Sequence, residues 1–404
     1  MAPPVAATIG DDEPVLPVDV LYDILLRLPA KPLCRFRAVC PSWRSLLRDP
    51  TFITAHAARH PGPLIAVAMK GIDKDVQLMD MSGNVIKRLK NGQECLTEYM
   101  WTHHDLVSLR GKDGLSRVLD PATGATSVLP PRPSRAARVT DMYVVGWAAA
   151  AGEYKALTIG ANDRLEDQVC MVLTLGGNTG WRERGSPPAR VDLRHGGEVA
   201  VVRGVAYFLM MTGINGGWHD WIVAFDLELE AWRPASIRGP MEPDEDPIYH
   251  SYVNLVEANG HLVASLMKPS GDTCAVELWF LMDPHNPLWS KQYTITLSNT
   301  RDCYEYVLKP LHVFEDGRIV VWICVGIGGY GVPRVYDPRT ENFTDGAVTA
   351  GLRAVGGVYT GSMLRTVGVS VSRPRRTKKP NPRFHGPEWH SVVPPRKILL
   401  KHRV

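Results

Sequence analysis

The sequence of 404 residues lacks any apolar run of 18 residues or more, which is the length that a membrane-spanning helix needs. No membrane span is therefore predicted. The first ten residues also lack a basic start, and three acidic residues follow them directly, so a secretory signal is not expected. The seven cysteines are scattered, odd in number and never spaced C-x-x-C. This pattern predicts free thiols in a reducing compartment, in the cytoplasm, the nucleus or both.

Motifs that carry catalysis are also missing. The sequence contains no G-x-S-x-G, no H-E-x-x-H, no P-loop and no H-x-E motif followed by C-x-x-C. His103, His104 and Asp105 stand together, but no second group of ligand-type residues accompanies them, so we favour a loop or strand edge over a metal site. The stretch "GIGGYG" is interpreted as a turn because no helical pattern follows it. We predict no catalytic residue, cofactor or metal, and no enzymatic activity.

Net positive charge is confined to the C-terminal segment. Residues 372–404 hold ten Lys and Arg against one acidic residue, which leaves residues 1–371 with a net charge of −5, the difference between +4 for the chain and +9 for this segment. A mildly acidic body argues against a nucleic-acid-binding groove. Residues 1–13 are expected to be a disordered acidic segment and 372–404 a disordered basic, proline-rich tail. Within that tail, "PRRTKKP" is either a nuclear localisation signal or a solvated basic stretch.

Short strand patterns dominate from residue 63 onward. Segments of four to eight β-forming residues, such as "PLIAVAM", "YKALTI" and "RIVVWICV", are separated by Gly, Asn, Asp and Pro. A local pattern also recurs, in which a strand is followed by an Asp or Gly turn and a second short strand. One residue near the start of this second strand serves as the reference position of each repeat. These reference residues are about 51 residues apart on average, and they are Ile86, Thr126, Trp181, Trp232, Trp289 and Phe343.

A period near 50 residues with about four strands per unit is typical of a β-propeller blade. We therefore predict an all-β domain over residues 60–371, a propeller of about six blades, with a β-sandwich-like arrangement as the alternative. The first unit is one strand short. The strands within Gly356–Gly368 are expected to pair with it and close the ring, which removes exposed sheet edges.

The N-terminal segment "LPVDVLYDILLRLPAKPLCRFRAVCPSWRSLL" differs from everything after it. Its apolar residues recur at helical spacing and its prolines divide it into three short helices. A unit of this size cannot bury enough surface to fold alone, so its apolar faces require cover from the rest of the chain or from another protein.

This segment resembles an F-box. The features that carry the resemblance are the two Leu-Pro steps, the Ile-Leu pair, the arginine-rich turn, Val-Cys and Trp-Arg-x-Leu, which lie between Leu16 and Leu46. Pro41 after Val-Cys and the bulky Phe36 are mild departures from the usual pattern. We assign the F-box to residues 14–56, a small all-α unit of three short helices.

The body resembles the F-box-associated domains of plant F-box proteins. Phrases similar to that family's recurrent segments, including "DPATGATSVLPP", "EYKALTI" and "WIVAFDLELEAWRP", occur in order over most of residues 64–345. The resemblance implies the non-catalytic substrate-recognition subunit of an SCF-type ubiquitin ligase, whose F-box docks on a Skp-family adaptor and through it on a cullin. The propeller would then hold a target protein, which the sequence does not identify.

The adaptor-binding residues expected from this resemblance are Leu16, Pro17, Ile24, Leu25, Leu28, Pro29, Leu33, Phe36, Val39, Cys40, Trp43 and Leu46. Packing within the helical unit itself is the alternative, especially for Leu21, Ile24 and Leu46. Contact with the target is expected from residues in or beside loops that the repeat does not explain, namely Trp218, His219, Trp221, Tyr304 and Tyr306. Two other functions remain open: a carbohydrate- or ligand-binding propeller with an F-box-like helical cap, and an F-box protein that directs no degradation.

Overall fold

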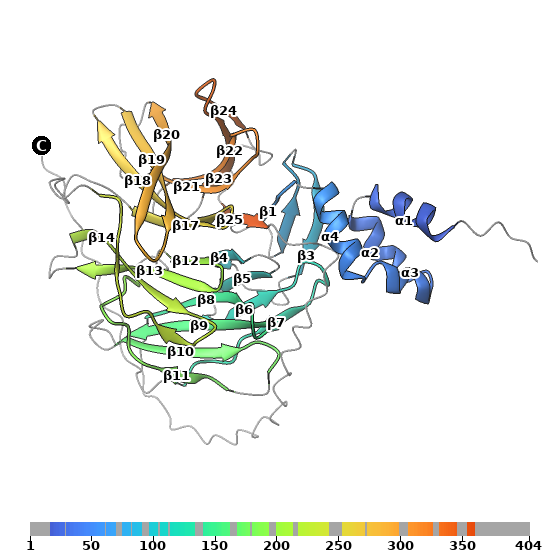
Figure 1. Ribbon diagram of the computed structural model, residues 1–404, viewed down its shortest axis with the longest axis horizontal. Helices are drawn as coiled ribbons and strands as arrows, with labels where there is room; N and C mark the ends of the chain where they lie inside the picture. The colour runs from blue at the N-terminus through green and yellow to red at the C-terminus, as the bar shows by residue number, and fades with distance from the viewer. Residues whose placement is uncertain are drawn as a thin grey trace, which may run out of the picture. The chain divides into compact units, whose positions relative to one another are not determined.

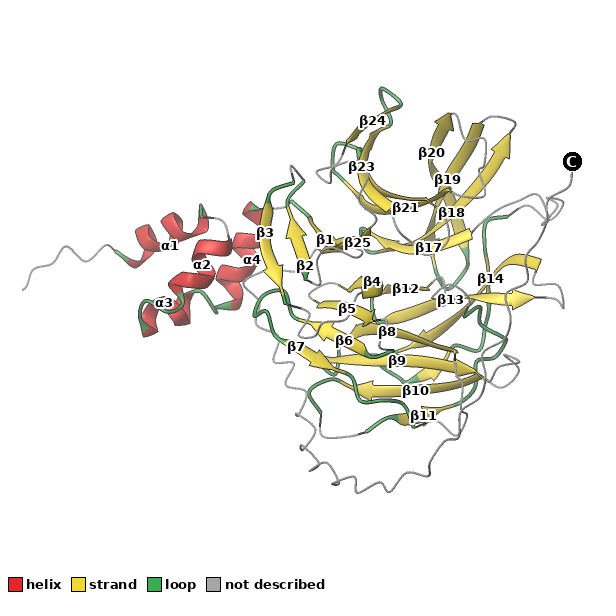
Figure 2. Cartoon of the chain, turned by 180° about the vertical axis from the view of Figure 1, so that it is seen from behind, coloured by secondary structure: helices red, strands yellow, loops and turns green. Residues whose placement is uncertain are grey.

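A computed structural model describes most of the chain between residues 17 and 359. Helices lie before residue 60 and strands after residue 63 (Figure 1, Figure 2). The described residues are 17–28, 30–60, 62–69, 75–81, 83–90, 97–103, 106–111, 114–133, 140–161, 168–177, 180–193, 199–212, 217–241, 253–270, 273–298, 306–325, 331–345 and 354–359. The acidic N-terminal segment and the basic tail predicted above fall outside them.

The helical unit has four helices in its described part, one more than predicted. They are α1 (Val18–Leu26), α2 (Ala30–Phe36), α3 (Pro41–Leu46) and α4 (Pro50–Arg59). The fourth begins where Asp49 caps it, because the carboxylate accepts hydrogen bonds from the backbone N–H groups of Thr51 at 2.8 Å and Phe52 at 3.2 Å. Pro50 occupies the first helical position, where a missing N–H costs nothing.

The described strands form six antiparallel blades, as the repeat predicts. Each blade has four successive strands, and β16 adds a fifth to the fourth blade. From the first strand of each blade outward, they are β25 (Ala354–Tyr359), β1 (Leu64–Met69), β2 (Val76–Met79) and β3 (Val85–Leu89); β4 (Thr97–His103), β5 (Leu106–Gly111), β6 (Ser116–Leu119) and β7 (Thr126–Val128); β8 (Thr140–Ala148), β9 (Glu153–Ala161), β10 (Gln168–Thr174) and β11 (Arg182–Arg184); β12 (Val199–Val202), β13 (Val205–Thr212), β14 (Gly217–Asp226), β15 (Ala231–Trp232) and β16 (Ile237–Arg238); β17 (Val253–Ala258), β18 (His261–Ser270), β19 (Thr273–Asp283) and β20 (Leu288–Ser298); β21 (Tyr306–Val313), β22 (Ile319–Val325), β23 (Gly331–Asp337) and β24 (Asn342–Asp345).

The blades close into a ring through their first strands. These contact one another in a complete cycle, β25 with β4, then β8, β12, β17, β21 and again β25. The first blade is completed by the end of the chain, since β25 pairs antiparallel with β1 from Leu64 opposite Tyr359 to Met69 opposite Ala354. The predicted closure is therefore confirmed: the closing strand is Ala354–Tyr359, and residues 360–368 of the predicted range lie outside the described residues. This closed ring excludes the β-sandwich-like alternative.

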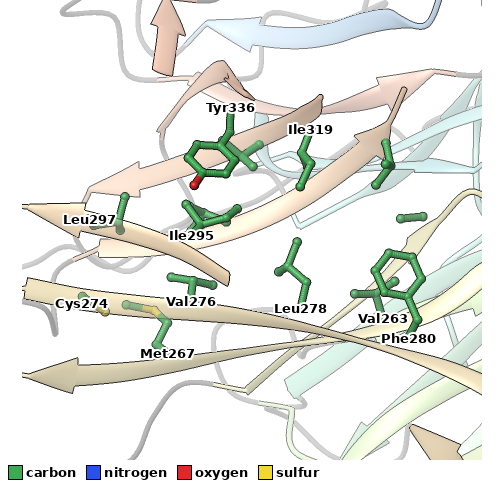
Figure 3. Close-up of a cluster of buried hydrophobic side chains, with 14 residues drawn as sticks. Val263, Met267, Cys274, Val276, Leu278, Phe280, Ile295, Leu297, Ile319 and Tyr336 are labelled. Carbon is green, nitrogen blue, oxygen red and sulfur yellow. The ribbon is translucent and has the colours of Figure 1, made fainter. Parts of the chain in front are cut away.

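Apolar side chains fill each of the six junctions between neighbouring blades. One buried cluster joins the first and second blades, and others follow around the ring to Trp322 of the sixth blade, which packs with Ile65, Val67 and Met79 of the first. In the junction between the fifth and sixth blades, Val276, Leu278 and Ile295 face Ile319 and Tyr336 (Figure 3). Each blade thus buries both of its faces against its neighbours, which is why the sequence shows near-continuous apolar strands.

The recurring aspartates have a common structural role at the turn between the third and fourth strands. In five blades the carboxylate oxygen Oδ1 accepts a hydrogen bond of 2.8 to 3.0 Å from a backbone N–H within that turn, which fixes its conformation. The five residues are Asp80, Asp120, Asp226, Asp283 and Asp337.

Three tryptophans of the repeat link neighbouring blades. The indole N–H of Trp181 donates to the Pro130 carbonyl at 2.9 Å, Trp232 to Gly185 at 2.8 Å and Trp289 to Arg238 at 2.8 Å. Each acceptor lies in the chain that follows the fourth strand of the preceding blade. These tryptophans therefore belong to the blade junctions rather than to a ligand cage.

A cluster of charges joins the third and fourth blades. The carboxylate of Glu230 lies 3.1 Å from Lys155 Nζ and 2.5 Å from Arg182 Nη2, and it also accepts hydrogen bonds from Arg184. Burial would raise the pKa of Glu230, but the hydrogen bonds from these three cations outweigh it and lower the pKa to about 2.

Ring closure predicts that a chain truncated after Asp345 is much less stable than one truncated after Val371. The shorter chain loses β25, and with it the buried side chains of Val358 and Tyr359, which are 8% and 1% exposed, and it leaves the edge of β1 open. Each lost burial costs about 1.5–3 kcal/mol. Thermal unfolding followed by circular dichroism should show a lower Tm for the shorter chain alone. Equal Tm values would contradict the closure.

Replacement of Glu230 by Gln should destabilise the propeller by about 1–3 kcal/mol, because it removes the charged acceptor shared by the buried Lys155 and the partly buried Arg182 and Arg184. The matched control is Glu183→Gln, which alters an exposed carboxylate on β11. Because folding lowers the pKa of Glu230 from 4.5 to about 2, its stabilisation is complete above pH 4.5 and is lost as the pH falls toward 2. Urea unfolding between pH 2 and 6 should show the wild-type advantage shrink over this range; a constant advantage would exclude the ionic explanation.

Candidate functional site

The helical unit has a hydrophobic core of its own. Leu25, Leu33, Leu47 and Phe52 are at most 1% exposed, and every side chain in their buried cluster comes from the four helices and the turns between them. Phe36 and Trp43 add an edge-to-face ring contact, with 5.4 Å between centroids. The N-terminal helices are therefore sealed against one another, and their core does not depend on the strands.

Polar contacts hold the helices in this arrangement. Arg37 Nη2 donates to the Leu47 carbonyl at 2.8 Å, and Arg44 Nε donates to the Arg37 carbonyl at 3.0 Å, which joins α2 to α3. A ring nitrogen of His56 bonds the Leu28 carbonyl at 2.9 Å, which joins α4 to the end of α1. Burial lowers the pKa of His56, so the neutral imidazole that donates this bond is favoured.

Four apolar side chains of the helical unit are exposed rather than packed in its core. On α1, Val20 and Ile24 lie four residues apart on one face and are 41% and 44% exposed. Val18 at the start of α1 is 72% exposed, and Val39 in the turn after α2 is 62% exposed. Apolar side chains on both sides of a short helix are unusual for a surface helix, which normally presents a polar outer face. We call Val18, Val20, Ile24 and Val39 the outer apolar surface.

The structure divides the predicted adaptor-binding residues into three groups. Pro17, Ile24 and Val39 are exposed, whereas Leu28, Phe36, Cys40, Trp43 and Leu46 are partly buried. Leu25 and Leu33 lie inside the helical core, so their assignment to a partner surface is corrected to an internal role. Helical spacing identified them as apolar, but it does not distinguish a helix's own core from a face that a partner covers. Leu16 and Pro29 lie outside the described residues.

The predicted target-contact residues do not form one cluster. Trp218 and His219 belong to strand β14, where Trp218 pairs with Met211, so their assignment to a loop was wrong. Trp221, on the same strand, is 40% exposed. Tyr306 begins β21 in the sixth blade, and Tyr304 lies outside the described residues. Because first and third strands run in the same direction, β14 and β21 start at the same end of the ring, but they belong to blades that are not neighbours.

Sequence reasoning missed a cavity on the axis of the propeller. Its volume is about 640 Å³, and the first strands of all six blades contribute to its lining. Trp101, Trp147 and Tyr154 supply aromatic surface, while Arg203, Lys309 and Glu257 supply charge. None of the five predicted target-contact residues is among the described lining. The only sequence signal nearby was His103, whose ring nitrogen lies 3.1 Å from Ser108 Oγ and whose pKa burial lowers to about 4.

The described residues contain no candidate metal cluster and no candidate membrane span. No group of three or more His, Cys, Asp or Glu side chains is placed to hold a metal ion there. Among the same residues, none of the helices has the length and apolar character to cross a membrane.

The chain thus combines a helical unit that exposes apolar side chains with a closed six-bladed propeller. The chain matches the model of the F-box domain over residues 14–54 and that of the F-box associated beta propeller domain over residues 79–344. An F-box/LRR-repeat/kelch-repeat protein of Arabidopsis thaliana is 25% identical over 320 residues, covering 76% of this chain and 84% of that protein. An F-box protein of the same plant is 25% identical over 307 residues, covering 69% and 74%.

The chain therefore belongs to the family of F-box proteins that carry an F-box associated β-propeller domain. It is an F-box protein of the substrate-receptor type, and such proteins are generally non-catalytic adaptors. Among solved structures, a chain of Kuenenia stuttgartiensis hydrazine synthase aligns with a TM-score of 0.43 and 11% identity, covering 74% of this chain and 46% of that chain. A similarity this low carries no argument about function.

The division between core and outer apolar surface predicts that two alanine substitutions differ strongly in their cost to stability. Leu33→Ala removes a fully buried side chain and should cost the helical unit about 2–5 kcal/mol, whereas Val39→Ala should change its stability by less than about 0.5 kcal/mol. Hydrogen exchange of amides in residues 17–60, followed by mass spectrometry, should accelerate in the first variant only. Similar exchange in both variants would show that Leu33 does not support the core.

Proposed function

We propose that this chain is the substrate-recognition subunit of an SCF-type ubiquitin ligase. In this proposal the outer apolar surface of α1 and the turn after α2 docks on a Skp-family adaptor, which a cullin holds. The propeller holds a target protein, whose identity stays open. Such a subunit acts in the cytoplasm, the nucleus or both, in agreement with the free thiols expected from the sequence.

The observation that carries the proposal is the outer apolar surface itself. The helices satisfy their own core through Leu25, Leu33 and Phe52, so Val18, Ile24 and Val39 are not needed for internal packing. Fully covering an aliphatic side chain contributes about 1.5–3 kcal/mol before the cost of association. Four such side chains offer a partner several kcal/mol of apolar burial, to which the exposed parts of Trp43 and Leu46 would add.

A receptor of this kind needs no reactive side chain. Its contribution is to hold a target lysine near the carrier that donates ubiquitin, which raises the local concentration of the two reacting groups. The order of the parts suits this task, because the buried cluster of the helical unit contains no residue of a strand, so the two parts have separate cores. A partner surface on one part can therefore be altered without disturbing the other.

Adaptor docking is tested by the double substitution Ile24→Asp and Val39→Asp in the full-length chain. Both positions are exposed, so the helices should stay folded while two charges enter the proposed interface. Co-purification with a recombinant Skp-family adaptor should fall at least tenfold, because each desolvated carboxylate costs several kcal/mol at an apolar contact. Leu25→Asp is unsuitable for this test because it would place a charge in the core.

The matched control is Val128→Asp, which alters an apolar residue of the propeller that is 40% exposed. This variant should retain adaptor binding, and hydrogen exchange in residues 17–60 should be unchanged in both variants. Retained binding in the double variant, or absence of binding by the unmodified chain, would refute the proposal. Capture of target proteins with the ligase step blocked would then be compared between the unmodified chain and the double variant, which should enrich the same targets without the adaptor.

A further inference from the structure

The axial cavity of the propeller combines an apolar wall with positive charge. Trp101 of β4 and Trp147 of β8 lie in its lining, and the ring of Tyr154 is 4.7 Å from that of Trp147 between centroids. Arg203 follows β12 and Lys309 lies on β21, in other blades of the ring. A volume of about 640 Å³ lies within the range of 300 to 1,000 Å³ that is typical of pockets for small organic ligands.

The charges of the described lining do not balance. Arg203 and Lys309 are cations, and Glu257 is the single carboxylate among these residues. Glu257 already accepts a hydrogen bond of 2.7 Å from the backbone N–H of Gly260 in its own turn. His103 adds no charge at neutral pH, because burial lowers its pKa to about 4. The cavity is therefore weakly electropositive and favours an anionic ligand.

Arg203 is held in a backbone conformation that its side chain does not favour. It forms a two-residue turn with Gly204 between β12 and β13, and its φ is +48° while that of Gly204 is +78°. Positive φ at both positions defines a turn in which Asn-Gly is strongly preferred. A non-glycine residue in this region is an observed departure from which a functional role can be inferred.

In the next blade, the residue at the equivalent position of the same turn has a structural role. Asn259 and Gly260 link β17 to β18 with φ values of +51° and +77°. The Asn259 side chain donates to the Val313 carbonyl at 2.6 Å and accepts from the Val313 N–H at 3.2 Å, which ties the fifth blade to the sixth. Arg203 makes no corresponding bond: within the described residues it has neither a hydrogen-bond nor an ion-pair partner. Its Nη2 lies instead 3.6 Å from the position that a Cβ on Gly260 would occupy.

We propose that the axial cavity binds a small organic anion with a flat apolar body. Arg203 binds the acidic group of this ligand, and Trp101 and Trp147 contact its rings. A carboxylate, sulfonate or phosphate would accept paired hydrogen bonds from the guanidinium. Aromatic faces bury flat rings efficiently and supply a contact that does not depend on charge. The site is independent of adaptor docking, so it stands or falls separately from the proposed ligase function.

The test uses two fluorescent probes of nearly equal shape with the full-length protein. 8-Anilinonaphthalene-1-sulfonate is an organic anion, and N-phenyl-1-naphthylamine has the same rings without the sulfonate. Both should bind the native protein with one saturable site. Arg203→Gln should weaken binding of the anion by about tenfold or more, as expected for a charge-assisted contact, and leave binding of the neutral probe unchanged. Arg203→Lys should restore part of the loss.

Two further variants locate the probes. Arg318→Gln removes an exposed arginine from the turn between β21 and β22, outside the cavity lining, and should leave both affinities unchanged. Ala149→Trp adds a bulky side chain to the cavity lining at the exposed turn after β8 and should weaken binding of both probes. Thermal unfolding must show that each variant is native. Equal weakening of both probes by Arg203→Gln, anion binding unchanged by it, or binding unaffected by Ala149→Trp would overturn the proposal.

Discussion

The antiparallel pairing of β25 with β1 is the constraint on which the propeller depends. It joins position 64 to position 359, so the first blade is incomplete until β25, the last described strand of the chain, has paired with β1. Each blade is a small sheet that cannot cover both of its faces alone, and each of the six apolar junctions needs a neighbour on either side. Without the closing pair, the first and sixth blades would each expose one face, and β1 would present an open edge to other chains.

The repeat in the sequence is visible because a few positions are fixed by geometry rather than by packing. The aspartates recur because the turn between third and fourth strands needs a side-chain acceptor for its backbone N–H groups. Trp181, Trp232 and Trp289 recur because an indole N–H reaches the carbonyl of the preceding blade while its ring covers the junction. The apolar strands between these marks vary freely, since many combinations of aliphatic side chains fill a junction of given volume.

This difference explains what could be predicted from the sequence. Blade number followed from the spacing of the repeat, ring closure followed from the strand missing in the first unit, and the F-box followed from its motif. The sequence could not predict which face of α1 is buried, with Leu25, and which is exposed, with Ile24. Both faces are apolar, and only three-dimensional contacts distinguish them. The loop assigned to Trp218 and His219 failed because flanking glycines are compatible with a strand end as well as a turn.

The axial cavity shows most clearly why some sites give no local signal in a sequence. Its described lining takes one or a few residues from each of six strands that are far apart along the chain, so no motif contains them. Arg203 is distinctive only in comparison with Asn259, and that comparison requires knowing that the two turns are equivalent. Because the ring must close for the strands to surround the axis, the cavity exists only in the complete propeller. A ligand held there would contact several blades at once, and its binding free energy would add to the stability of ring closure.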